Sequence, residues 1–265
     1  MTEKTVQYQG LSVYYTVSGA GEPVVLVHGL GEDGQIWKGL STALEKDHQL
    51  IVPDIPGSGR SAGLPTEPTI DALAESLKPV LDQEGITRCT MIGHSMGGCI
   101  ALAFAERYPA LVGRLGLFHA TSFADSDERK ETRKKNIDLI HREGAAKFIE
   151  QSTPNLFSPE SRGHHPALVA ETVQRYTSFS PASLVYYTMA MMNRPERTAV
   201  LTRFAGPVLF IMGEYDKAVP LEQSLRECHL PGISYIYVCT HSAHLGMLEE
   251  PEFCAGAVAY FLSGK

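Results

Sequence analysis

The sequence has few cysteines, and they lack the spacing that disulfide frameworks or redox motifs require. The chain of 265 residues contains five cysteines, an odd number, with no C-x-x-C pair. They are Cys89, Cys99, Cys228, Cys239 and Cys254, and the first, second and fourth lie in apolar runs typical of a protein core. This pattern favours reduced, buried cysteines in a cytoplasmic protein.

Long hydrophobic runs and an excess of positive charge are also missing. No apolar run approaches the roughly 18 residues that a membrane-spanning helix needs, and the first residues do not resemble a signal peptide. Lysine and arginine number 23 against 30 aspartates and glutamates, a net charge of −7. These features argue against nucleic acid or a membrane as a partner and predict a cytoplasmic protein. A monomer and a homodimer are both compatible with the sequence.

The residues that are present alternate between two patterns. Continuous apolar runs, typical of strands buried on both faces, occur at residues 24–28, 49–53, 88–93, 114–118, 207–212 and 233–238. Helical patterns follow at residues 35–46, 69–84, 98–108, 221–229 and 251–262, and residues 5–17 read as an antiparallel hairpin. The alternation predicts an α/β fold, with a mostly parallel sheet covered by helices on both faces.

Residues 122–203 interrupt this alternation because they contain no convincing strand. Helix-like patches occur at residues 137–149 and 184–192. We expect a helical cap inserted over the carboxyl ends of the strands, with residues 1–121 and 204–265 forming the core domain. A charged run begins the insertion, and pairs such as Glu131–Lys135 at i,i+4 spacing favour a solvated helix face.

One motif carries most of the chemical information. Residues 93–97 read Gly-His-Ser-Met-Gly, directly after an apolar run and directly before a helical one. This G-x-S-x-G pattern predicts a strand, a sharp turn and a helix, with Ser95 exposed at the apex. Glycine at 93, 97 and 98 lets the strand and helix approach closely. We therefore expect Ser95 to be a nucleophile.

A serine hydroxyl needs a base, and the base needs an orienting acid. His244 follows the last predicted strand and so shares the carboxyl edge of the sheet with Ser95, while His241 is a rival nearer the strand end. Asp216 follows the strand at residues 207–212 and is the preferred acid over Glu214. The order serine, aspartate, histidine is the one expected for this kind of turn.

Two further aspartates offer a second geometric option for the acid. Asp125 and Asp127 come after the sixth predicted core strand. The same reaction also needs donors for the developing oxyanion. We expect these to be the backbone N–H groups of Met96, after the nucleophile, and of Leu30, on the glycine-rich loop at residues 28–33.

With these residues placed, nearly the whole chain resembles the α/β-hydrolase superfamily. The motifs are residues 28–31, 54–61, 93–98 and 213–216 with Pro220, and His244 followed by residues 249–251. The resemblance implies an eight-stranded, mostly parallel sheet with a helical cap after strand six. It also implies a catalytic triad of Ser95, Asp216 and His244 and an oxyanion hole of Leu30 and Met96. Members that use an aspartate nucleophile are disfavoured by Ser95.

The resemblance is strongest to small carboxylesterases and to meta-cleavage-product, enol-lactone and pimeloyl-methyl-ester hydrolases. It implies a serine hydrolase that cleaves a carboxylic ester or lactone with hydrophobic groups through an acyl-enzyme on Ser95. The alternatives are a carbon–carbon bond hydrolase or perhydrolase with the same triad and, last, a non-enzymatic ligand receptor. No cofactor is needed for this chemistry.

The expected partner is a small-molecule ester or lactone. No metal site is expected, because His164 and His165 have no further ligands at suitable spacing. No arginine clamp for a carboxylate is evident. Aromatic and methionine side chains of the cap and neighbouring loops are expected to line an apolar pocket, with substrate-binding residues Phe118, His119, Tyr186, Met189 and Met247.

Overall fold

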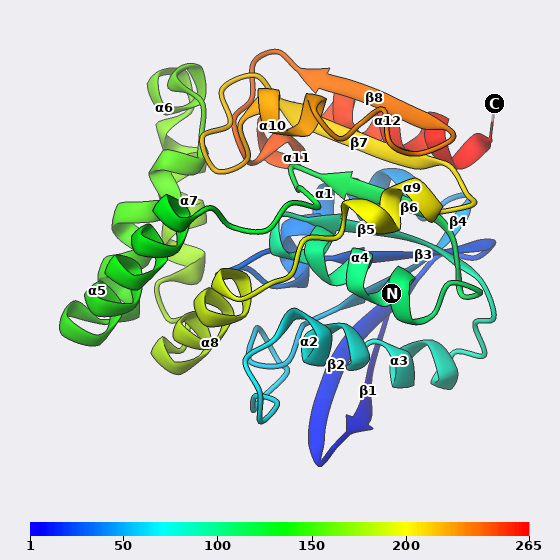
Figure 1. Cartoon of the computed structure of the whole chain (residues 1–265), viewed down its shortest axis with the longest axis horizontal. Helices are drawn as coiled ribbons and strands as arrows, with labels where there is room; N and C mark the ends of the chain where they lie inside the picture. The colour runs from blue at the N-terminus through cyan, green and yellow to red at the C-terminus, as the bar shows by residue number, and fades with distance from the viewer. Residues whose placement is uncertain (265) are drawn as a thin grey trace.

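The fold is built on one eight-stranded sheet. The computed structural model describes residues 1–264 (Figure 1). The strands are β1 (Thr2–Tyr8), β2 (Leu11–Ser18), β3 (Glu22–Val27), β4 (His48–Pro53), β5 (Cys89–His94), β6 (Val112–Phe118), β7 (Val208–Gly213) and β8 (Ser234–Cys239). Their order across the sheet is β1-β2-β4-β3-β5-β6-β7-β8. Only the pairs β1–β2 and β2–β4 are antiparallel, which confirms the predicted mostly parallel α/β sheet.

The local sequence explains the central strands and the hairpin. Every residue of β5 and of β7 is buried, as the continuous apolar runs predict for strands covered on both faces. The β1–β2 hairpin pairs Tyr8 with Leu11 across a two-residue loop. Gln9 and Gly10 both have positive φ, the requirement of the turn type whose twist suits such a hairpin.

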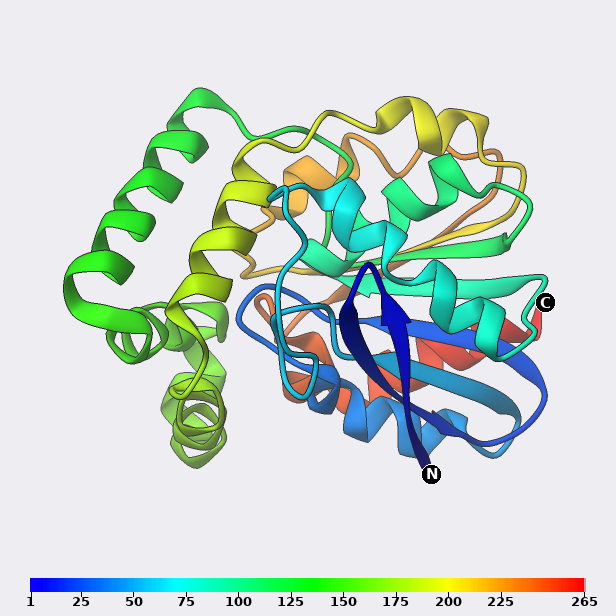
Figure 2. The same cartoon turned by 90° about the horizontal axis from the view of Figure 1, so that it is seen from below.

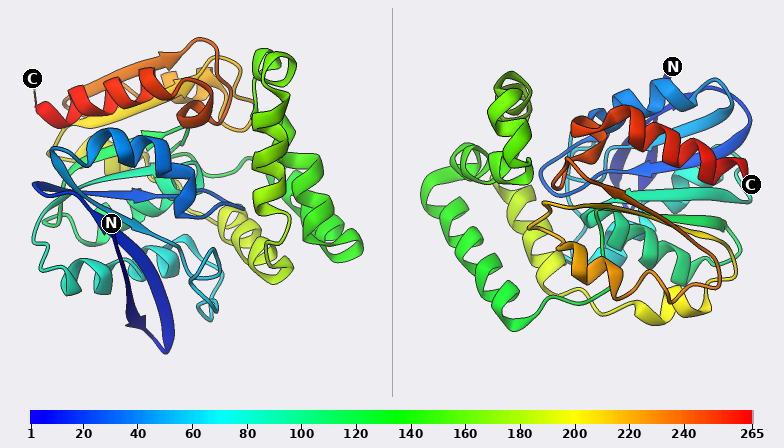
Figure 3. Two further views of the ribbon diagram at one scale, coloured as in Figure 1. Left: turned by 180° about the vertical axis from the view of Figure 1, so that it is seen from behind. Right: turned by 90° about the horizontal axis from the view of Figure 1, so that it is seen from above.

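Helices cover both faces of the sheet. On one face lie the single-turn helix η1 (Gly34–Trp37), α1 (Lys38–Leu44), α11 (Gly246–Glu249) and α12 (Pro251–Ser263) (Figure 3). The other face carries α2 (Ile70–Glu75), α3 (Lys78–Gln83), α4 (Met96–Arg107) and α10 (Leu221–Leu225). Each layer buries its own apolar cluster against the sheet, so the sheet separates two cores.

The predicted helix at residues 69–84 is two helices. Thr69 caps the first, accepting a hydrogen bond from the N–H of Ala72 at 3.1 Å. The second begins at Lys78 with Pro79 in its first turn. Proline cannot donate the hydrogen bond that would continue the preceding helix, so the break falls there. The predicted helix at residues 221–229 is also shorter, ending at Leu225.

The insertion between β6 and β7 is helical and forms a cap. It contains α5 (Asp127–Ser152), the single-turn helix η2 (Thr153–Leu156), α6 (Pro159–His164), α7 (Pro166–Tyr176) and α8 (Pro181–Met192), which stand together at one side of the sheet (Figure 2). Gly144, with φ +88°, bends α5 between two helical stretches. The cap has a small apolar cluster of its own, in which Ile140, Phe148 and Leu184 are buried.

Two details of the insertion differ from the expectation. The charged run does form a solvated face of α5, but Glu131 pairs with Lys134 at 2.6 Å rather than with Lys135. The last helix, α9 (Thr198–Arg203), packs with the core rather than with the cap helices, because Val200 and Leu201 join the apolar cluster that covers the α4 face of the sheet. Among residues 1–264, no helix is long and apolar enough to cross a membrane.

The junction of β5 and α4 depends on close backbone approach. A methyl group at Gly93 would collide with the backbone of Gly97, and one at Gly97 would collide with the carbonyl of Val27. Only glycine fits at these two positions. The strand and the helix can therefore make the sharp turn that carries Ser95.

We predict that Gly93→Ala lowers the free energy of unfolding by roughly 1–3 kcal/mol, the usual cost of overpacking. Gly256 is a matched control, because it lies exposed in α12 and a methyl group added there would meet open space. Gly256→Ala should stabilise the protein by about 0.5–1 kcal/mol through helix propensity. Urea unfolding of the three proteins measures both effects. Equal effects of the two substitutions would contradict the packing argument.

Candidate active site

Ser95 occupies a strained turn at the carboxyl end of the sheet. It follows β5, precedes α4 and has φ +51° and ψ −116°, a conformation that non-glycine residues rarely adopt. Its N–H donates to the carbonyl of Phe118 at 3.0 Å, which fixes the turn to β6. Ser95 is half-buried whereas all of β5 is buried, and it lines a cavity of about 990 Å³.

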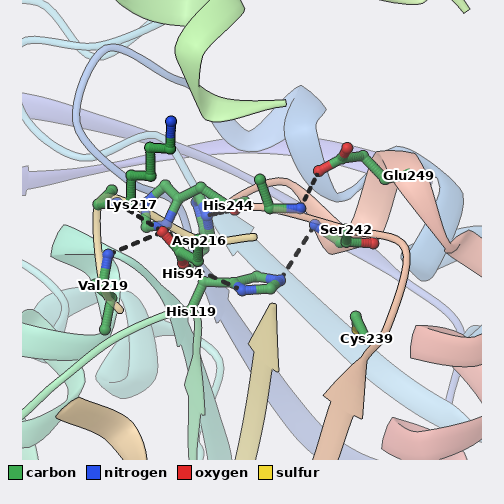
Figure 4. A network of polar contacts seen from close by, with 12 residues as sticks. His94, His119, Asp216, Lys217, Val219, Cys239, Ser242, His244 and Glu249 are labelled. Atoms are coloured by element: carbon green, nitrogen blue, oxygen red, sulfur yellow. Dashed lines mark hydrogen bonds and ion pairs between the residues drawn. The ribbon is translucent and has the colours of Figure 1, made fainter. Parts of the chain in front are cut away.

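His244 and Asp216 form a buried pair beside the same cavity (Figure 4). The distance from His244 Nδ1 to Asp216 Oδ2 is 2.7 Å. The other carboxylate oxygen accepts the N–H groups of Ala218 and Val219, each at 2.8 Å. Burial alone would raise the pKa of Asp216, but the charge and hydrogen bond of His244, together with the nearby His119 ring, hold it well below its usual range. The carboxylate is therefore ionised, and Nδ1 of His244 donates to it.

The rival residues lie in other environments. His241 is exposed and contacts Glu160 at 2.9 Å, and Glu214 is exposed. Asp125 is buried but binds the Arg194 guanidinium at 2.6 Å, and Asp127 is exposed in the first turn of α5. Of the acids and bases considered from the sequence, the structure brings together Asp216 and His244.

The two expected oxyanion donors lie on adjacent loops. Leu30 lines the cavity from the loop after β3, which neighbours β5 in the sheet. Met96 is the first residue of α4, and the N–H groups of the first helical turn have no partner within a helix. His28 holds the Leu30 loop in place, because its Nε2 contacts the N–H of Ile55 at 3.0 Å and the hydroxyl of Ser58 at 2.8 Å.

Known proteins show the same architecture. The sequence profile of the alpha/beta hydrolase fold matches residues 22–251. The chain belongs to the α/β hydrolase fold family. A Yersinia enterocolitica protein named as a carbamate hydrolase, RutD, is 30% identical over 224 residues, which is 81% of this chain and 80% of that one. A catalytic triad and an oxyanion hole are typical of the family.

Solved structures are also similar. An esterase from Thermogutta terrifontis is 28% identical, with a TM-score of 0.93 over 100% of this chain and 99% of its own. The enol-lactonase from Burkholderia xenovorans shares the fold, with 21% identity and a TM-score of 0.90 over 98% and 100%. An uncharacterized protein of Mycobacterium tuberculosis is 33% identical over 119 residues, 44% of this α/β hydrolase chain and 35% of that protein.

The sequence reasoning missed one buried pair in this α/β hydrolase. His94, directly before Ser95, places Nδ1 2.9 Å from Glu32 Oε2 and Nε2 2.8 Å from the carbonyl oxygen of His244. The same carboxylate oxygen of Glu32 accepts the N–H of Gly29 at 2.8 Å. Both partners of the His94 ring are acceptors, so both ring nitrogens donate and the imidazole is charged. An acidic residue inside the glycine-rich loop after β3 is the signal that could have revealed it.

The directions of the pKa shifts of His94 and Glu32 agree with a pair in which both side chains are charged. Burial disfavours the charged imidazole, but the charge and the hydrogen bond of Glu32 outweigh burial and raise the pKa of His94. Burial acts to raise the pKa of Glu32, yet His94 and the N–H of Gly29 lower it overall. The pair therefore stabilises the fold wherever both groups are charged.

The cavity extends from the sheet edge into the cap. Its apolar wall includes Leu30, Phe148, Ile149, Tyr176, Met191 and Leu245. Its charged wall includes Asp125, Arg129, Arg133, Arg194, Lys217 and Arg226. Asp125 binds both Arg133 and Arg194, so one carboxylate faces two guanidinium groups. Arginines thus line the cavity, although no arginine clamp for a carboxylate was evident from the sequence, and two of them are paired with Asp125.

The five expected substrate-binding residues lie away from the cavity wall. Phe118 packs edge-on against Trp37, with ring centroids 5.3 Å apart, and Met247 is buried in the same core cluster. His119 is buried beside Asp216. The hydroxyl of Tyr186 donates to the carbonyl of Glu67. Met189, in α8, is half-buried, and none of the five contributes to the lining. Proximity in sequence to the predicted site does not fix the direction in which a side chain points.

We predict that His94→Asn lowers the free energy of unfolding by about 3–5 kcal/mol near pH 5.5, because it leaves the buried Glu32 carboxylate without a positively charged partner. The raised pKa of His94 gives stability that is complete below the unfolded value of about 6.5 and is lost as pH rises through the folded value. The lowered pKa of Glu32 gives stability that is lost towards acid pH. The gap between wild type and variant should therefore be largest between about pH 4.5 and 6.5.

Urea unfolding at about pH 5.5 and at about pH 9 measures this gap. His241→Asn is the matched control, because His241 also contacts a glutamate but is exposed, and its removal should change stability little at either pH. A His94→Asn gap that stays constant or grows towards pH 9 would contradict the charged pair.

Proposed function

We propose that this chain is a serine hydrolase that cleaves a carboxylic ester or lactone carrying a hydrophobic group. The observation that carries the proposal is the buried Asp216–His244 pair at 2.7 Å, with His244 and Ser95 lining one cavity. The similarity to the Thermogutta esterase over the full chain supports the same chemistry. We propose Ser95 as nucleophile, His244 as base and Asp216 as the orienting acid.

The mechanism follows from the state of each group. Asp216 is ionised and occupies Nδ1 of His244, so the lone pair of Nε2 is free to take the proton of the Ser95 hydroxyl. The oxygen then attacks the carbonyl carbon of the ester. Asp216 stabilises the imidazolium that forms, and His244 gives the proton to the departing alkoxide, which leaves as the alcohol. Water repeats the cycle on the acyl-enzyme and releases the acid.

The oxyanion of each tetrahedral intermediate needs neutral donors. The N–H of Met96, at the start of α4, and the N–H of Leu30, on the cavity wall, are the proposed pair. Oriented N–H groups stabilise a charge that exists only in the intermediate, an effect worth about 3–4 kcal/mol for one donor. Because α4 directs its N-terminus at the turn, its dipole also favours negative charge there.

The cavity limits the substrate class. The apolar wall formed by Phe148, Ile149 and Met191 is suited to the hydrophobic acyl or alcohol group. A volume of about 990 Å³ accommodates a small to medium ester with room for water. Similar proteins are named as an esterase, a carbamate hydrolase and an enol-lactonase. Each of the reactions that these names describe begins with attack on an acyl carbonyl. We therefore propose an ester or lactone as the small-molecule partner.

We predict hydrolysis of short-chain p-nitrophenyl esters and covalent labelling of Ser95 by a fluorophosphonate. Ser95→Ala should abolish both, because it removes the attacking oxygen. Intact-protein mass spectrometry locates the adduct, and release of p-nitrophenol measures turnover. Failure of wild type both to turn over and to label would refute the proposal. Turnover of vinylogous diketones far above that of simple esters would indicate carbon–carbon bond hydrolysis instead.

We predict that Asp216→Asn and His244→Ala each lower kcat by roughly 10³–10⁶-fold while the fold is retained. The amide removes the charge that orients His244, and alanine removes the base. His241→Ala and Glu214→Gln are matched controls on the same two loops, both exposed, and should retain activity. Steady-state kinetics with circular dichroism compares the four variants. If Asp216→Asn were fully active, Asp125→Asn and Asp127→Asn would be the next variants to test.

A further inference from the structure

His119 is a buried histidine that the proposed reaction does not use. It directly follows β6 and has φ +49°, an uncommon conformation for a residue with a side chain. Its N–H donates to the carbonyl of Ile211 on β7 at 2.8 Å, which ties the backbone of the bend to the neighbouring strand. Its side chain has no exposed surface and contacts Asp216.

The partners of the ring define its tautomer. Nε2 accepts the N–H of Gly246 at 3.2 Å, so that nitrogen carries no hydrogen. Burial lowers the pKa of His119 to about 4, which leaves the ring neutral at physiological pH. The hydrogen therefore resides on Nδ1. This atom faces Asp216 Oδ2 at 3.5 Å and has no closer hydrogen-bond partner within residues 1–264 (Figure 4).

Two imidazole rings therefore approach the same carboxylate oxygen of Asp216. His244 Nδ1 lies at 2.7 Å from Oδ2 and His119 Nδ1 at 3.5 Å, while backbone N–H groups occupy Oδ1. A side chain on Gly246 would collide with Nε2 of His119, so the segment that follows His244 packs directly on this ring. One ring thus contacts both the acid and the segment that carries the base.

We propose that His119 is a positioning residue, which fixes the Asp216 carboxylate and the loop of His244 relative to each other. The inference rests on the proposed function, because it assigns His119 a part in orienting the base. The Nδ1–H dipole stabilises the negative charge on Asp216 without neutralising it. His119 also limits how far the carboxylate can rotate when His244 becomes charged.

The ionisable groups around His119 are few. Asp216 approaches from the loop after β7 and His244 from the loop after β8, with its ring centroid 5.9 Å away. His94 approaches from β5, with its ring centroid 6.1 Å away. The charged His94 and any positive charge on His244 both disfavour protonation of His119. The ring therefore acts as a fixed neutral dipole and not as a second base.

The test compares two substitutions of His119. Phenylalanine fills the space but removes the donor to Asp216 and the acceptor for Gly246. Asparagine tolerates positive φ and can place an amide donor near the position of Nδ1. We expect His119→Phe to lower kcat about 10–100-fold with KM changed less than about twofold, and His119→Asn to recover most of kcat. Ile211→Val, a buried change on β7, is the packing control.

The pH profile separates positioning from packing. Without the His119 dipole, Asp216 becomes a stronger partner for the imidazolium of His244, so the acidic limb of kcat/KM should move up by about 0.5 pH unit or more in His119→Phe. The limb should stay in place in His119→Asn and Ile211→Val. An NMR titration of the His244 ring should show the same shift, and it does not require turnover.

The outcomes distinguish the two proposals. If wild type cleaves no ester, the proposed function fails, and the NMR titration still tests whether His119 acts on the Asp216–His244 pair. If His119→Phe keeps the wild-type kcat and His244 titration, the positioning role is overturned. It is also overturned if the three variants, His119→Phe, His119→Asn and Ile211→Val, lower kcat equally and leave the pH profile unchanged. That result would indicate that His119 contributes packing alone.

Discussion

The arrangement of the site depends on the buried Glu32–His94 ion pair. Glu32 accepts the N–H of Gly29 and the Nδ1 hydrogen of His94, and the other ring nitrogen donates to the carbonyl of His244. Burying two charges is costly unless each finds a partner and further hydrogen bonds. Here the cost is offset by contacts that join three segments: the loop after β3, the turn of Ser95 and the loop after β8. A hydrophobic pair of the same volume would fill the space without fixing these segments.

The need for such a connection follows from the sheet. β3 and β5 are neighbours, so the loop of Leu30 and the turn of Ser95 are adjacent by strand order alone. β8 is the edge strand, and β6 and β7 separate it from β5. The loop of His244 therefore has to reach back across two strand positions. Its carbonyl is held by His94, and its N–H donates to the carbonyl of Leu156 in the cap at 2.9 Å. His244, the proposed base, is therefore positioned by hydrogen bonds of both its backbone N–H and its carbonyl.

The sequence allowed the sheet, the nucleophile turn and the pairing of Asp216 with His244 to be predicted because these features have local patterns. Apolar runs mark strands buried on both faces, and the spacing of glycines marks the turn. Contacts between distant segments have no such pattern. Glu32 and His94 are 62 positions apart. The acidic residue in the glycine-rich loop after β3 marks Glu32 as unusual, but nothing local to that loop identifies His94 as its partner. The cavity wall is also not a local pattern: Phe118 and Met247 belong to apolar runs that pack in the core, whereas α5, α7 and the start of the cap contribute to the wall.

The cap is joined to the core where the insertion begins and ends, and also through the loop of His244. Asp125, near its start, binds Arg194, near its end, and the N–H of Arg197 donates to the carbonyl of Ser122 at 2.7 Å. These contacts close the insertion into a loop whose two ends lie together. The hydrogen bond from His244 to Leu156 connects the cap to the loop of His244. A single such bond contributes only about 0.5–1.5 kcal/mol, small enough to break and large enough to bias the position of a loop. Phe148 and Ile149 of the cavity wall lie near the end of α5, and η2 follows α5 directly, so a short stretch of chain joins this wall to the carbonyl that accepts the N–H of His244.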